Sequence, residues 1–343
     1  MTQPVWIPPT AAPRAVALPV VPAQYHEFYR TPALRWWKPI AALLMGAGLW
    51  MVASLVLVLI AIAYDVAQGT STLEGVLAGE LRVTPAIFVA NNVSLALGIP
   101  TAFLTQWAVF GQRPRWLSSV AGGFRWNWFW RVLGIALVPY LVYLAFEITV
   151  MGGLDGLAWQ ANSLFMIAAI LLTTPLQAAG EEYLIRGLLT RLVGAYLSRM
   201  AGLVVATIIS ALVFMALHGA GDPWLNAFYL LFAVVGSILV WRTGGLEAAI
   251  ALHVVNNVVG MAGLPFSDIS ELFDRQAGSG NALVLVQMTL ILVVAALALW
   301  SGRRRRLVSE SAPGAPLPAP VYAQLNNSTA WTTTEVRHEQ HPG

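Results

Sequence analysis

Long apolar runs recur along the chain and are separated by short polar connections. A helix rises about 1.5 Å per residue and the hydrocarbon core of a bilayer is about 30 Å thick, so a run of about 20 apolar residues predicts a transmembrane helix. The pattern therefore predicts an all-α fold, a polytopic membrane helical bundle of eight transmembrane helices. The expected spans are residues 40–64, 85–109, 131–151, 163–185, 201–218, 225–241, 246–262 and 282–300.

The composition agrees with a single transmembrane domain. Hydrophobic residues make up 58% of the 343 residues and charged residues 10%, which excludes a soluble domain with one apolar core. The chain has no cysteine, so disulfides and thiolate chemistry are excluded. We expect a Pro-rich flexible tail over 1–38, a transmembrane domain over 39–302, and a basic cluster with a disordered tail over 303–343. Within the first tail, Tyr25 to Lys38 is expected to lie on the membrane surface.

Basic residues gather in every second connection between the expected spans. Because cytoplasmic connections carry an excess of Lys and Arg, both termini are expected in the cytoplasm, and the membrane is expected to be the cell membrane. The net charge of +3 is divided among these connections, so the chain offers no patch for nucleic acid. The residues that set the orientation are Arg30, Arg35, Lys38, Arg113, Arg115, Arg125, Arg131, Arg191, Arg199, Arg242 and Arg303 to Arg306.

The candidate chemistry starts from two adjacent carboxylates, Glu181 and Glu182, within an apolar stretch. An ionisable side chain at the centre of a membrane helix costs about 2.5 to 3.5 kcal/mol on insertion scales, so such a pair is a functional hypothesis by default. Residues four apart share a helix face. This spacing favours Arg186 as the partner of Glu182 and leaves Glu181 free to act as a base.

Two histidines, His218 and His253, lie in the apolar body of the chain. His253 shares a helix face with Asn257, four residues later. Peptide hydrolysis needs a base for water and donors for the tetrahedral oxyanion, and these residue types supply both. Taken alone, a membrane histidine is as often a hydrogen-bonded interior residue. The pairing of Glu182 with Arg186, taken alone, is as often a structural ion pair.

Helix geometry predicts that the carboxylates and the first histidine meet. A hairpin that turns near Arg199 has arms of about 27 Å and brings Glu181 and His218 to the same level. The depth of this level stays open, because the expected end of the fourth span puts Glu181 near the cytoplasmic side. A helix break at Pro175 or Gly180 is one way to reconcile the two.

Three motifs in order carry a resemblance to a known family. The segments E-E-Y-L-I-R-G from Glu181, F-M-A-L-H from Phe214 and H-V-V-N-N from His253 resemble the EExxxR, FxxxH and HxxxN motifs of the CPBP family. That family comprises intramembrane proteases, which include the type II CAAX prenyl endopeptidases, and the Abi bacteriocin-immunity proteins. The resemblance covers residues 160–262, and every motif position matches.

The resemblance implies an intramembrane endopeptidase with eight spans. It implies that Glu181 activates a water molecule, that His218 helps to hold this water, and that His253 and Asn257 stabilise the oxyanion. The residues implied to support the site are Glu182, Arg186 and Phe214.

The expected substrate is a membrane-associated peptide or protein, or a CAAX-like C-terminal peptide. Two histidines and a glutamate are also a common catalytic zinc set, so a divalent metal such as zinc on Glu181, His218 and His253 is an open alternative, although the helical H-E-x-x-H spacing is absent. The alternative function is a non-catalytic immunity or scaffold protein that binds a peptide or partner in the same cavity. A transporter is a weaker alternative, because no internal repeat is visible.

Overall fold

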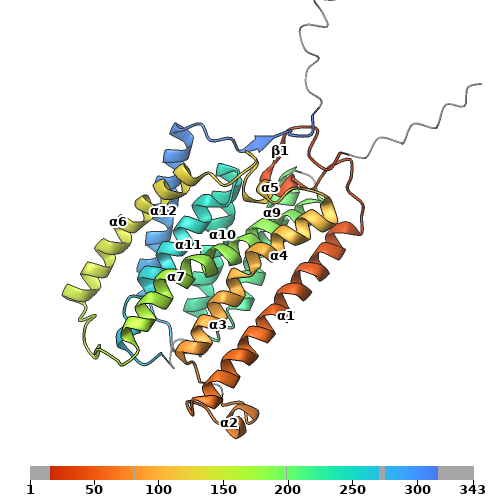
Figure 1. Ribbon diagram of the computed structural model, residues 1–343. Helices are drawn as coiled ribbons and strands as arrows, with labels where there is room; N and C mark the ends of the chain where they lie inside the picture. The colour runs from red at the N-terminus through yellow and green to blue at the C-terminus, as the bar shows by residue number, and fades with distance from the viewer. Residues whose placement is uncertain (1–15, 81, 198, 270–274, 316–343) are drawn as a thin grey trace, which may run out of the picture.

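The computed structural model describes residues 16–80, 82–197, 199–269 and 275–315. Eight helical segments in this part of the chain are long and apolar enough to cross a membrane, which confirms the predicted bundle. They pack side by side as shown in Figure 1. The spanning elements are α1 (Lys38–Ala67), α3 (Pro85–Ala96) with α4 (Gly98–Thr105) and η2 (Gln106–Phe110), α6 (Trp126–Val150), α7 (Ser163–Glu182) with η3 (Tyr183–Leu189) and α8 (Thr190–Gly194), α9 (Arg199–Leu217), α10 (Pro223–Thr243), α11 (Glu247–Gly260) with η4 (Leu264–Phe266), and α12 (Val284–Arg304).

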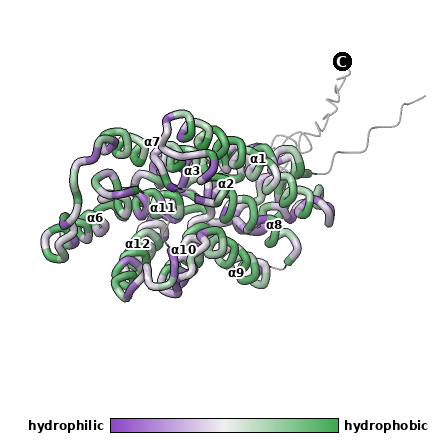
Figure 2. The backbone as a smooth tube through the Cα atoms, turned by 90° about the horizontal axis from the view of Figure 1, so that it is seen from below, coloured by the Kyte–Doolittle hydropathy of each residue, from purple (hydrophilic) through white to green (hydrophobic). Residues whose placement is uncertain are grey.

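The outside of the bundle is apolar. Figure 2 shows hydrophobic colouring along most of the helices. Large aliphatic side chains such as Leu44 and Met51 on α1, or Ile208 on α9, are exposed. In water such a surface would be a liability, whereas in a bilayer it faces lipid tails of the same polarity. The protein is therefore a multi-pass membrane protein, and its polar side chains are kept for the interior.

The fourth span is longer than the sequence pattern predicts. It runs from Ser163 to Gly194, whereas the expected span ended at residue 185. Pro175 lies inside the helix without ending it. The helix then continues through η3, a π-helical segment in which the N–H of Thr190 bonds to the carbonyl of Ile185, five residues back. Glu181 consequently lies near the middle of the span, which removes the conflict over its level.

The two terminal segments meet at one end of the bundle. Strand β1 (Ala23–Gln24) pairs antiparallel with β2 (Glu310–Ser311), and Figure 1 shows both at the same end. An even number of spans requires the two segments to lie on one side. The compartment that this end faces remains the expectation drawn from the loop charges.

The segment before α1 differs from the flexible surface tail expected over 1–38, although residues 1–15 lie outside the described part. Tyr25 begins the short helix η1 (Tyr25–Glu27), and its ring is buried together with that of Phe28. The guanidinium of Arg191, at the end of the fourth span, lies 3.9 Å from the centre of the Tyr25 ring. Burial raises the pKa of the Tyr25 phenol. Cation–π contact explains why these aromatic side chains pack inwards, while Trp36 stays exposed as expected of a surface residue.

Gly180 sets how closely α7 approaches the α3–α4 segment. A methyl group built on Gly180 would overlap the carbonyl oxygen of Leu95 and lie 3.0 Å from the Cα atom of Ala96. Small residues at helix crossings allow backbones to approach in this way. Glu181 directly follows Gly180, so the close helix crossing also fixes the position of the first carboxylate.

We expect Gly180→Ala to lower the stability of the protein. The added methyl group must push α7 away from Leu95, and overpacking of this kind costs about 1 to 3 kcal/mol. The measurement is thermal unfolding in detergent, with Gly134→Ala as the control, because Gly134 also lies within a spanning helix, α6, but has open space around it. Equal melting temperatures for the two variants would show that the close crossing is not required.

Candidate active site

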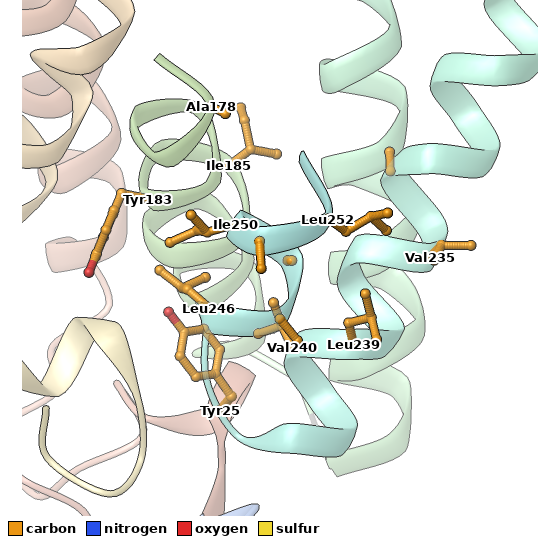
Figure 3. Packing of buried hydrophobic residues seen from close by; sticks show 14 of the residues in the cluster. Tyr25, Ala178, Tyr183, Ile185, Val235, Leu239, Val240, Leu246, Ile250 and Leu252 are labelled. Carbon is orange, nitrogen blue, oxygen red and sulfur yellow. The ribbon is translucent and has the colours of Figure 1, made fainter. Parts of the chain in front are cut away.

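The seven residues predicted from sequence lie on α7, η3, α9 and α11 and, for His218, directly after the end of α9. These elements are held together by one buried apolar cluster, which includes Ile185 on η3 and Ile250 and Leu252 on α11. Figure 3 shows these side chains between the helices. The apolar packing fixes the relative positions of the helices, and the polar side chains then occupy the space that the packing leaves.

Glu182 is buried and contacts two other residues of the site, Arg186 and His253. Its side chain has no exposed surface, and its Oε1 atom accepts from Nη1 of Arg186 at 3.0 Å. The same oxygen lies 2.8 Å from Nδ1 of His253, a geometry suited to donation by that ring nitrogen. The predicted pairing of Glu182 with Arg186 is therefore present, and Glu182 also orients His253. Sequence spacing could not reveal this second contact, because it joins two different helices.

Glu181 points to the other side of His253. Its Oε2 atom lies 3.6 Å from Nε2 of His253. Its Oε1 atom accepts from Nε2 of Gln177 at 2.5 Å. Among the described residues, Oε2 has no hydrogen-bond partner. Glu181 thus has one carboxylate oxygen held by Gln177 and a second that is buried beside His253 without a hydrogen-bond partner among the described residues.

His218 is fixed at the end of α9 by its own helix. Its Nδ1 atom lies 2.7 Å from the carbonyl oxygen of Phe214, so Nδ1 carries the proton that it donates and Nε2 is left as an acceptor. The ring stacks on Tyr229, with centroids 4.0 Å apart. The guanidinium of Arg186 lies over the Phe214 ring, 4.2 Å from its centre. Phe214 therefore supports His218 and Arg186 at once.

Hydrogen bonds between side chains and the backbone hold the segment that follows His218. The carbonyl of His218 accepts from Arg275 at 2.8 Å, and the N–H of Gly278 donates to Asp222 at 2.9 Å. Burial of Asp222 disfavours its ionised form, but four backbone N–H groups donate to it, outweigh the burial and hold its pKa below the ordinary value. His218 is thus held through its ring by the carbonyl of Phe214 and through its own carbonyl by Arg275.

Asn257 joins the site through Gln177, a residue that the sequence reasoning missed. Nδ2 of Asn257 donates to Oε1 of Gln177 at 3.1 Å, and Gln177 in turn donates to Glu181. Gln177 lies four residues before Glu181, so the same helix-face spacing that paired Glu182 with Arg186 could have found it.

The site opens into a cavity of about 860 Å³. Residues of α1, α3, α6, α9, α10 and α11 line it, together with Glu181, His218 and Asn257. His253 and Glu182 are buried beneath this surface. The volume lies within the range of about 300 to 1,000 Å³ typical of ligand sites. All seven predicted residues are therefore linked by contacts around one cavity.

The geometry does not favour a metal site. In the described part of the chain, no group of three or more His, Cys, Asp and Glu side chains is arranged to hold a metal ion. In the set considered from the sequence, Nδ1 of His253 is bonded to Glu182 and Nδ1 of His218 to the carbonyl of Phe214, while Oε2 of Glu181 lies 3.6 Å from Nε2 of His253. We therefore derive no chemical step through a metal.

Comparison with known proteins identifies the same region. The family described as type II CAAX prenyl endopeptidase Rce1-like matches residues 160–259, which confirms the resemblance for the segment that holds the three motifs. The uncharacterized protein YyaK of Bacillus subtilis (strain 168) is 26% identical over 154 residues, which cover 42% of this chain and 50% of YyaK. The chain thus spans about half the length of this curated relative. No solved structure matches the chain.

Proposed function

We propose that the protein is an intramembrane endopeptidase that hydrolyses a peptide bond with water activated by Glu181. The observation that supports this most is that Glu181 lines the cavity and that its Oε2 atom, buried 3.6 Å from Nε2 of His253, has no hydrogen-bond partner among the described residues. A family match to CAAX-type endopeptidases over residues 160–259 agrees with this reaction class. The proposed substrate is a membrane-associated or CAAX-like C-terminal peptide.

The proposed reaction uses Oε2 of Glu181 and Nε2 of His218, which have no hydrogen-bond partner among the described residues. Oε2 of Glu181 removes a proton from the water, while Nε2 of His218 accepts the water's other hydrogen bond and holds it in place. The resulting hydroxide attacks the peptide carbonyl carbon, and the carbonyl oxygen becomes an oxyanion. Asn257 donates an N–H to this oxyanion, and His253 donates from Nε2 when that atom is protonated. Glu181 then passes its proton to the leaving nitrogen, the C–N bond breaks, and the carboxylate is restored.

The buried residues act by holding this arrangement. Glu182 is itself held by Arg186 and keeps His253 in one orientation. Phe214 provides the carbonyl that fixes the tautomer of His218. Orientation of this kind contributes to the rate because a misplacement of about 1 Å can cost about 10²-fold.

A peptide-library assay on purified protein tests the proposed function. We expect the wild type to produce new peptide ends, and His218→Ala to lose about 10²-fold or more in rate because the water is no longer held. The matched control is His26→Gln, since His26 is also buried but bonds to the carbonyl of Arg199 at the β1–β2 end. Cleavage by His218→Ala at the wild-type rate would contradict the mechanism.

The alternative of a non-catalytic binder gives a different pattern. A binder should tolerate the isosteric change Glu181→Gln in a phenotypic complementation assay, whereas a protease should not. Loss of complementation by Glu181→Gln with unchanged peptide binding therefore favours catalysis.

Metal removal provides a separate prediction. We expect dialysis against a chelator to change the rate of peptide cleavage by less than about twofold, because the proposed reaction uses no metal and the described part of the chain holds no group of three or more His, Cys, Asp and Glu side chains arranged for one. The measurement is activity before and after dialysis, with metal content of the same samples determined by elemental analysis. Loss of activity that is restored by a stoichiometric divalent ion would support the zinc alternative and contradict activation of water by Glu181 alone.

A further inference from the structure

A chain of hydrogen bonds runs from α6 to the carboxylate of Glu181. The hydroxyl of Tyr140 donates to Oδ1 of Asn256 at 2.9 Å, and Nδ2 of Asn256 donates to Oδ1 of Asn257 at 3.1 Å. Nδ2 of Asn257 donates to Oε1 of Gln177 at 3.1 Å. Finally, Nε2 of Gln177 donates to Oε1 of Glu181 at 2.5 Å. All of these bonds point toward the carboxylate.

The direction of the chain is set by its end at Glu181. An ionised carboxylate can only accept hydrogen bonds, whereas each amide side chain has one accepting oxygen and one donating NH₂ group. Gln177 must therefore turn its NH₂ group to Glu181 and its oxygen to Asn257. Asn257 in turn must direct its NH₂ group to Gln177. One of its two N–H bonds is used in this contact, and the other remains for a second acceptor.

Burial makes this orientation costly to reverse. The side chains of Gln177 and Tyr140 are almost completely removed from solvent. A flipped amide would place oxygen against oxygen and leave buried polar atoms without partners, and such groups are penalised more strongly in low-dielectric surroundings. The chain therefore holds its amide groups in a single arrangement.

We propose that Gln177 is a positioning residue that couples the base to the oxyanion donor. Through Nε2 it holds one oxygen of Glu181 and so fixes the position of the other, which has no hydrogen-bond partner among the described residues. Through Oε1 it holds Asn257 with its NH₂ group on the side where the oxyanion forms. In the proposed reaction Gln177 acts through Glu181 and Asn257 and takes no proton itself. The inference rests on the proposed function and adds a residue outside the three motifs.

The first test is the kinetics of Gln177→Met. Methionine has a similar size but lacks the donor and the acceptor, so Glu181 and Asn257 become free to rotate. We expect kcat to fall by about 10- to 100-fold while KM changes by less than about threefold, because orientation at the reacting atoms is lost and peptide binding is not.

The matched control is Thr173→Val, one helical turn earlier on α7. Thr173 accepts a hydrogen bond from Asn92 and donates to the carbonyl of Ala169, so the substitution also removes a side-chain hydrogen bond from α7. It leaves the chain to Glu181 intact, and kcat should stay within about twofold of the wild type. Melting temperatures of both variants report whether the fold is kept.

A double-mutant cycle separates positioning from general stability. Because Gln177 holds both Glu181 and Asn257, the loss caused by Gln177→Met should be smaller in an Asn257→Leu background than in the wild type, since only the contact with Glu181 is then left to lose. A Gln177 side chain that merely stabilised the fold would reduce kcat by the same factor in both backgrounds. Should Gln177→Met fail to fold, Tyr140→Phe tests the same chain from its far end, with kcat expected to fall by about two- to fivefold at unchanged KM.

The outcomes distinguish this inference from the proposed function. Gln177→Met with kcat within twofold of the wild type, a loss confined to KM, or multiplicative losses in the cycle each overturn the positioning role. In these cases the proposed peptidase function is retained as long as Glu181→Gln is inactive. Cleavage that does not depend on Glu181 at all overturns the proposed function itself.

Discussion

The isosteric variant Glu181→Gln is expected to lose peptide cleavage by about 10²- to 10⁴-fold in kcat, which is the contribution of a positioned general base. The amide oxygen of the new side chain can still accept from Gln177, so the packing around position 181 is preserved. What disappears is the carboxylate oxygen Oε2, which has no hydrogen-bond partner among the described residues and faces His253. The measurement is kcat and KM on a peptide cleaved by the wild type.

Two further variants make this expectation specific. Glu181→Asp keeps a carboxylate but withdraws it by one methylene group, so we expect a rate between those of the wild type and Glu181→Gln. Glu74→Gln removes an exposed carboxylate on α2 (Leu73–Leu77), far from the site in the chain, and is expected to cleave at the wild-type rate. Equal activity of Glu181→Gln and Glu74→Gln would show that the base lies elsewhere.

The second large effect concerns stability rather than chemistry. Glu182→Gln is expected to destabilise the protein by about 3 to 5 kcal/mol, because it leaves the guanidinium of Arg186 buried without a countercharge. Both side chains are completely buried, and Nε and Nη2 of Arg186 have no other partner among the described residues. The carboxylate is thus needed to keep the arginine inside.

The double variant Glu182→Gln/Arg186→Met should regain much of the lost stability without regaining activity. Removal of both charges relieves the uncompensated cation, but His253 still lacks the carboxylate that orients it. Unfolding in detergent measures the first effect and peptide cleavage the second. A surface control is Glu310→Gln, which breaks an exposed ion pair with Arg199 and is expected to cost at most about 1 kcal/mol. A Glu182→Gln variant as stable as Glu310→Gln would contradict a charged buried pair.

The bundle was predictable from sequence because each span is a continuous run of apolar residues and can be recognised without knowledge of the rest of the chain. The ends were less so. The fourth span was expected to end at residue 185 and Arg191 to lie in the connection that follows, whereas the structure buries both Arg186 and Arg191 inside the bundle. Only tertiary contacts, with Glu182 for the first and with the Tyr25 ring for the second, make that burial acceptable.

The same limit separates the parts of the site that could be predicted from those that could not. Spacing of four residues correctly paired Glu182 with Arg186, since both lie on one helix face. The contacts of His253 with both glutamates join α7 to α11, and no spacing within one helix encodes them. Gln177 had a detectable signal in its distance from Glu181, but an amide without a motif is not distinguishable from an ordinary interior residue.

The central claim is that this cavity hydrolyses peptide bonds through Glu181. Mass spectrometry of peptides incubated in liposomes with the wild type or with Glu181→Gln tests it most directly, because it reads the new peptide ends themselves. We predict defined ends that appear with the wild type and are absent with Glu181→Gln, while Glu74→Gln reproduces the wild-type set. Identical ends at equal rates with the wild type and Glu181→Gln, or no new ends with any variant, would contradict the account.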